Sequence, residues 1–200
     1  IEERLVGSEM CIRDRIISDE VYSGADRNWV PFFKESEDCV SISSFTKIHG
    51  LGEIRYGWMI ASKEIIQNAE NTFHNLAGIM SSPVIRIANR VKDRLNEPVE
   101  LIEYYREKNL PVLENVLRRL GIEWTAPPYG VFGAFRIPNV NTMQMIDTIG
   151  KEHGLLAVPG CMFDSGLEEW LRVGWSIDPE SFAKAAEVLE IVIRTAMDIT

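Results

Sequence analysis

The pattern of apolar and polar positions predicts strands and helices that alternate along the chain. Short apolar runs of strand length lie at residues 16–22, 40–45 and 56–61, and the second run alternates apolar with polar residues. Residues 63–74 carry apolar side chains at helical spacing and follow Ser62, a residue type that favours helix N-termini. We expect the run at 16–22 to form a buried strand that ends in polar residues.

The middle of the chain, residues 82–121, is predicted to be helical, in two or three pieces. Asn96 is a candidate N-cap, Pro111 is expected to kink or break the helix, and Gly121 suits the C-terminal end. The apolar stripe of this segment comprises Leu101, Tyr104, Tyr105, Leu113, Val116, Leu117 and Leu120.

The last part of the chain mixes strand and helix patterns. Strands are expected at residues 131–137, 155–158 and 171–177. A helix capped by Asn141 should end near Gly154, and a final helix should follow Asp178. Strands that alternate with helices predict an α/β fold, here in two parts joined by the helical middle segment.

Composition narrows the class of protein. The chain has 200 residues, 46% of them apolar and 26% charged, and a formal charge of −9. Nucleic acid and anionic membrane surfaces are therefore not expected partners, because clustered positive charge binds both. No apolar run reaches the roughly 20 residues that a membrane-spanning helix needs. The three cysteines are scattered, which suits neither a disulfide framework nor a metal site and suggests a reducing cytoplasm.

The N-terminal segment is predicted to be foreign to the protein. Residues 5–15 match, without a break, the translation of a transposon-type sequencing adapter, so residues 1–15 are excluded from the predicted fold. On this interpretation the natural sequence is cut upstream of Ile16, and we expect the chain to be a fragment.

Residues suited to catalysis and anion binding stand at predicted strand ends and in a glycine-rich loop. Taken singly, each is more often a solvated surface group than a functional one. Their spacing makes a shared role worth considering, because Arg55 follows the loop lysine Lys47 by eight positions. The set comprises Asp19, Tyr22, Ser44, Lys47, Arg55 and Arg172.

Together these residues resemble the class I/II aminotransferases, which are pyridoxal-phosphate enzymes of fold type I. That family has a strand ending in Asp-x-x-Tyr, then Ser-x-x-Lys, then an arginine eight residues after the lysine, and later a substrate-binding arginine. The segment 159–163 is similar to the family's Pro-Gly-x-x-Phe segment. The resemblance implies part of a large domain with a mostly parallel sheet at 16–82, interdomain helices at 83–121 and a small α+β domain at 122–200.

The resemblance also implies pyridoxal 5′-phosphate as the cofactor and no metal. Lys47 would hold it as a Schiff base and, once free, would move a proton at the substrate α-carbon. Asp19 would pair with the pyridine nitrogen, and Tyr22 would donate to the 3′-oxygen. Ser44 and Arg55 would bind the phosphate.

The implied activity is transfer of an amino group between an amino acid and a 2-oxo acid, with Arg172 binding the substrate α-carboxylate. A homodimer in the cytoplasm is expected. Three alternatives stay open: a lyase or decarboxylase of the same fold, an aminotransferase-like effector domain of a transcription regulator, and an α/β scaffold with solvated charges. The sequence does not identify the amino donor or acceptor, nor the role of His49.

In the family, residues upstream of the Asp-x-x-Tyr strand supply a phosphate cup at a helix N-terminus, a ring-stacking aromatic and an asparagine. None of these is found in the 200 residues, and the central strands of the large-domain sheet are also missing. We therefore expect an unpaired sheet edge and an open apolar face. The chain by itself should be inactive and either marginally stable or prone to aggregate.

Overall fold

The computed structural model describes residues 15–26 and 28–199, and the chain divides into two compact units, Ile1–Val99 and Glu100–Thr200. The predicted adapter segment, residues 1–15, lies outside the described residues except for Arg15. Within the described ranges, no helix combines the length and the apolar character needed to cross a membrane.

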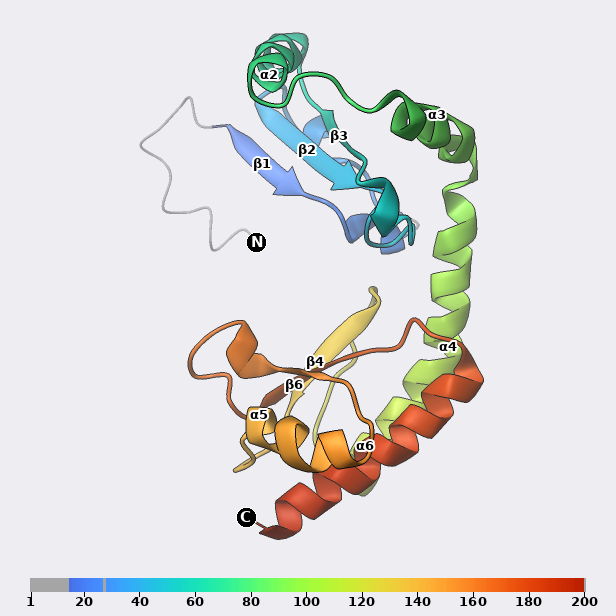
Figure 1. Ribbon diagram of the computed structural model, residues 1–200, viewed down its shortest axis with the longest axis vertical. Coiled ribbons are helices and arrows are strands. Elements are labelled where there is room, and N and C mark those ends of the chain that lie inside the picture. The colour runs from blue at the N-terminus through green and yellow to red at the C-terminus, as the bar shows by residue number, and fades with distance from the viewer. Residues whose placement is uncertain (1–14, 27, 200) are drawn as a thin grey trace. The chain divides into compact units, whose positions relative to one another are not determined.

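The first unit is built on a three-stranded sheet in the order β1-β2-β3 (Figure 1). Strand β1 (Ile16–Asp19) runs parallel to β2 (Cys39–Ser44), and β3 (Gly57–Ile60) runs antiparallel to β2. All of these strands lie in segments where apolar runs predict strands. Short 3-10 turns connect them, namely η1 (Ser23–Ala25), η2 (Phe32–Lys34) and η3 (Gly52–Ile54).

Strand β1 is not buried, so that prediction is wrong. Ile16 is 39% exposed and Ile17 67% exposed. In the described part of the chain, β1 pairs with β2 alone, so nothing adjoins its other edge. An apolar strand buries its side chains only where a further strand or a helix covers it. The open edge and the exposed isoleucines agree with the expected unpaired edge and open apolar face.

Two helices follow the sheet of the first unit. Helix α2 (Lys63–Leu76) starts after Ser62, which occupies the N-cap position as predicted but makes no hydrogen bond through its hydroxyl. None of the side chains of α2 is fully buried: Ile65, Ile66 and Ala69 are half-buried and Phe73 is 42% exposed. Helix α3 (Ser82–Val91) leads through the 3-10 turn η4 (Lys92–Arg94) into α4 (Asn96–Arg119).

Helix α4 continues through Pro111, so the expected break does not occur. The boundary between the two units falls inside α4, between Val99 and Glu100. The carbonyl that Pro111 leaves without a donor is that of Glu107, an exposed residue, so water can hydrogen-bond to it. Leu110 and Leu113 are buried on either side of Pro111 and hold both halves of the helix to the same core. Asn96 begins the helix instead of preceding it.

The second unit contains an antiparallel sheet in the order β4-β6-β5. Its strands are β4 (Phe132–Arg136), β5 (Val158–Pro159) and β6 (Trp170–Gly174), and its helical segments after α4 are α5 (Thr142–Met145), the π turn η5 (Ile146–Gly150), the 3-10 turn η6 (Gly160–Met162) and α6 (Pro179–Ile199). Residues of α4, α5, α6, β4 and β6 share one hydrophobic core. Strand β5 is shorter than predicted, because Leu155 and Leu156 lie outside it and Leu156 is 95% exposed.

Three predicted helix ends in this unit are confirmed. Asn141 accepts a hydrogen bond from the Gln144 backbone at 3.0 Å, and Asp178 caps α6 in the same way through Ser181 N at 2.9 Å. Gly121 adopts φ +69, the left-handed conformation that ends α4.

Candidate active site

The residues predicted to bind the cofactor lie at one end of the first sheet, where the parallel strands β1 and β2 have their carboxyl ends. Because β1 and β2 are parallel, Asp19 and Ser44 both stand at carboxyl ends of their strands. Strand β3 is antiparallel, and its first residue, Gly57, pairs with Ser44, so Arg55 precedes β3 at the same end. Lys47 lies in the loop between Ser44 and Arg55. The carboxyl end of parallel strands is the usual place for ligand sites in α/β sheets.

Lys47 lies close to Tyr22 at this end of the sheet. Its Nζ lies 5.9 Å from the centroid of the Tyr22 ring. Lys47 and Asp19 are exposed, whereas Tyr22 and Ser44 are half-buried. Asp19 Oδ1 accepts from Val21 N at 3.2 Å, which leaves its other oxygen for a ligand.

Arg55 stands in a strained backbone conformation. Its φ is +51 with ψ +43, a left-handed geometry that costs a non-glycine residue roughly 1–2 kcal/mol. Neighbouring hydrogen bonds hold it there, from Arg55 N to Gly52 O and from Phe45 N to Tyr56 O. Strain that the surrounding fold maintains is common where a side chain must be aimed at a ligand.

The buried carboxyl group of Glu20, which the sequence did not reveal, supports the same end of the sheet. Glu20 is 3% exposed, and its Oε1 accepts from Phe32 N and from Ser41 Oγ, each at 2.8 Å. Ser43 Oγ also donates to the Glu20 carbonyl at 3.2 Å. These bonds tie the end of β1 to β2 and to the loop at Phe32, and thereby fix the position of the neighbouring Asp19.

His49 belongs to an aromatic cluster beside Lys47. Its ring lies edge-on to Phe45, with centroids 6.0 Å apart, and 6.1 Å from Trp58. Desolvation by burial holds the pKa of His49 below its ordinary value of 6.5, and a hydrogen bond to the backbone of Leu95 offsets part of this effect. His49 therefore packs against the lysine loop as a neutral ring at neutral pH.

Arg172, the predicted carboxylate ligand, belongs to the second unit. It pairs with Ala134 on β4 and with Val158 on β5. Its guanidinium carbon lies 3.7 Å from the centroid of the Phe132 ring and 5.6 Å from that of Phe163. Sequence reasoning did not foresee these ring contacts, because they depend on the register of the sheet.

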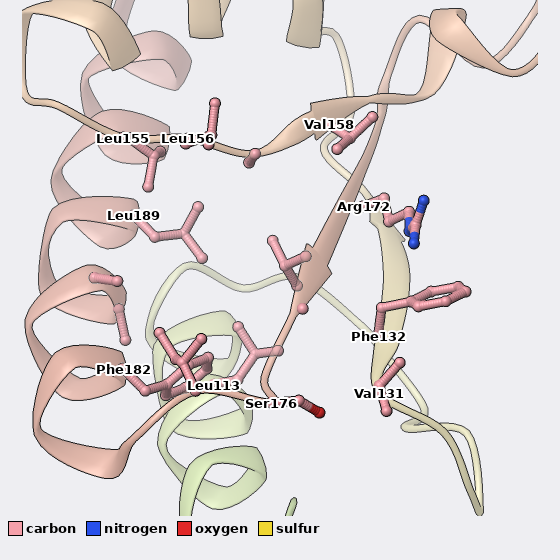
Figure 2. A pocket seen from close by; sticks show the side chains of 16 residues that line it. Leu113, Val131, Phe132, Leu155, Leu156, Val158, Arg172, Ser176, Phe182 and Leu189 are labelled. Carbon is pink, nitrogen blue, oxygen red and sulfur yellow. The ribbon is translucent and has the colours of Figure 1, made fainter. Parts of the chain in front are cut away.

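An apolar pocket of about 600 Å³ lies in the second unit beside Arg172, the one charged residue among those that line it. Leu155, Leu156 and Leu189 line one part of it (Figure 2). The Arg172 head group points away from these leucines and lies over the Phe132 ring.

The family model for aminotransferase class I and II matches residues 13–189. The chain belongs to this family. It is 21% identical to an aspartate aminotransferase of Streptomyces avermitilis over 94% of this chain and 49% of that protein. It is 30% identical to a histidinol-phosphate aminotransferase of Pyrococcus furiosus over 56% of this chain and 31% of that protein. The chain thus spans half or less of the length of these relatives.

Solved structures of aminotransferases share the fold. An alpha-aminoadipate aminotransferase from Thermus thermophilus, complexed with N-(5′-phosphopyridoxyl)-L-leucine, superposes with a TM-score of 0.79 at 20% identity. That match covers 99% of this chain and 55% of the other. A putative aminotransferase from Silicibacter pomeroyi gives a TM-score of 0.80 at 19% identity over 96% of this chain and 53% of the other. These likenesses confirm the predicted fold type I architecture.

Proposed function

We propose that this chain is part of a pyridoxal-phosphate-dependent aminotransferase that moves an amino group between an amino acid and a 2-oxo acid. Family membership supports the reaction class. The observation that carries the proposal is the gathering of Asp19, Ser44, Lys47 and Arg55 at one end of the sheet, with Tyr22 close to the lysine.

The chemistry of these groups fits a phosphorylated aromatic aldehyde. Lys47 offers the primary amine that would attach the cofactor covalently. Asp19 offers a carboxylate for the ring nitrogen, and Tyr22 offers a phenol for the ring oxygen. Ser44 and Arg55 offer a hydroxyl and a guanidinium fork for the phosphate.

Each residue then has a defined task in the reaction. The cofactor, when bound, withdraws electrons from the substrate α-carbon. Asp19 favours the protonated ring nitrogen by its negative charge. The Lys47 amine takes the α-proton as a general base and returns a proton as a general acid. Arg172 binds the α-carboxylate through two parallel N–H···O bonds and so orients the substrate.

We further propose a homodimeric enzyme in the cytoplasm, with small amino and oxo acids as its only ligands besides the cofactor. Membership of the class I and II family supports this assembly. The scattered cysteines support a reducing compartment.

Covalent labelling tests the cofactor site. The chain is incubated with pyridoxal phosphate, reduced with borohydride, and digested for peptide mass spectrometry. We expect the reduced adduct on Lys47, its loss in Lys47→Ala, and its retention in the matched control Lys151→Ala. Equal labelling of Lys47, Lys63 and Lys151 would count against a specific site.

Activity is tested with the longest open reading frame that carries this chain. We expect an amino acid to yield its 2-oxo acid together with an aminated acceptor. Release of carbon dioxide or ammonia without an aminated acceptor would instead indicate a decarboxylase or lyase. The 200-residue chain alone should show no transamination.

A further inference from the structure

The guanidinium of Arg172 is held by aromatic faces. Its Cζ lies 3.7 Å from the Phe132 centroid and 5.6 Å from the Phe163 centroid, and Figure 2 shows the head group over the Phe132 ring. Within residues 15–26 and 28–199, its N–H groups have no hydrogen bond to an acceptor and no ion pair. The ring contacts are thus what fixes the head group.

The arrangement differs from that of two other arginines in the same unit, Arg119 and Arg136. Arg119 gives its N–H groups to Glu190, and Arg136 gives Nε to Glu169 at 2.6 Å. In those pairs a protein carboxylate already occupies the fork. At Arg172 the described residues provide ring contacts and no carboxylate partner, so N–H donors remain available for a ligand.

The fold builds this stack from separate segments. Arg172 is directly opposite Ala134 on β4, and Phe132 lies two residues from Ala134, on the same face. Phe163 follows η6, which begins at Gly160. A Cβ at Gly160 would lie 2.3 Å from Leu167 O, so only glycine lets this turn pack so closely before Phe163.

We propose that Phe132 and Phe163 are positioning residues for Arg172, holding its fork ready for the substrate α-carboxylate. The proposal deepens the proposed function and rests on it for the identity of the ligand. Cation–π attraction restricts the tilt of the guanidinium, and arginine favours such stacking. A fork that is already oriented loses less side-chain entropy when it binds a carboxylate.

A chemical probe tests the ring contacts in the full-length protein that carries this chain. Phenylglyoxal reacts at guanidinium nitrogens, and the Phe132 ring on one side of the Arg172 group should slow its approach. We expect Phe132→Leu to raise the modification rate of Arg172 about fivefold, from a contact of typical cation–π strength. Phe132→Tyr keeps the π face and should restore the slow rate. The exposed Arg118 in the same digest is the internal reference.

Two further variants separate the stack from general loss of stability. Phe182→Leu alters the core on α6 without touching Arg172, and it should leave the rate unchanged. Phe163→Leu changes a ring that is 58% exposed, so the fold should tolerate it, and we expect a rise of about twofold. An Arg172 rate that is the same in wild type, Phe132→Leu and Phe163→Leu overturns the proposal.

Kinetics of the loaded full-length enzyme give the second readout. Phe132→Leu should raise KM for the amino acid about fivefold and leave kcat nearly unchanged, because the carboxylate contact is made in both ground and transition states. A fall in kcat at constant KM overturns the positioning role. If the wild-type enzyme shows no transamination, the proposed function fails, and the phenylglyoxal result still decides whether the rings hold Arg172.

Discussion

Asn109 ties helix α4 to the chain just beyond β6, and replacing it with alanine should destabilise the second unit. Asn109 is 1% exposed, and its Nδ2 donates to Trp175 O at 2.7 Å and to Ile177 O at 2.8 Å. Its Oδ1 has no partner among the described residues, so its removal costs no hydrogen bond.

The magnitude follows from the surroundings of the two carbonyls. Trp175 is fully buried, so its unpaired carbonyl should cost about 2 kcal/mol. Ile177 is 44% exposed, and water can reach its carbonyl, so that loss should be about 1 kcal/mol. Alanine returns roughly 0.6 kcal/mol through its helix propensity. The exposed Asn115 on the same helix receives that gain alone and is the matched control.

The assay is equilibrium urea unfolding followed by helical circular dichroism. The free energy of unfolding of Asn109→Ala should lie about 3 kcal/mol below that of Asn115→Ala. A difference in unfolding free energy between the two variants smaller than about 1 kcal/mol would show that the hydrogen bonds of Asn109 do not stabilise the packing of α4 against residues 175–177.

Two pH-dependent predictions follow. Hydrogen bonds from Arg119 and Arg194 lower the pKa of Glu190 to about 2, so its stabilising contribution is complete above pH 4.5 and is lost as the pH falls toward 2. The stability difference between wild type and Glu190→Gln should shrink over that window in urea titrations, and a constant difference would contradict the assignment. Burial lowers the pKa of His49 below 6.5, so its neutral form stabilises the fold above that pH and the contribution is lost as pH falls further. His49→Phe should remove this dependence, and an imidazole NMR titration midpoint above 6.5 would argue against burial.

Some elements were predictable because their signals are local. Helix α6 buries Phe182, Ala186, Leu189 and Ile193, which lie on one face at helical spacing. The left-handed Gly121 at the end of α4 likewise follows from residue type alone. The prediction that β1 is buried was wrong, because the burial of a strand depends on which other strands and helices cover it, and the apolar pattern of residues 16–19 does not show that.

Pro111 illustrates where local preference loses to packing. Its ring removes one helical hydrogen bond, yet α4 continues from Asn96 to Arg119. The buried Leu110 and Leu113 flank it and bind both turns to one core. A sequence pattern does not show that Glu107, whose carbonyl lacks a donor because of Pro111, is exposed to solvent.

The sequence by itself determined the family and the spacing of the residues at the proposed cofactor site. Tyr22 follows Asp19 by three positions, Lys47 follows Ser44 by three, and Arg55 follows Lys47 by eight. The tertiary structure decided how those residues and Arg172 are supported. Glu20, which follows β1, accepts a hydrogen bond from Ser41 on β2 and so links the two strands. The antiparallel register of β4 with β6 places Phe132 in contact with Arg172. These contacts join segments that are distant in the chain, and register and burial are settled by packing rather than by local propensity.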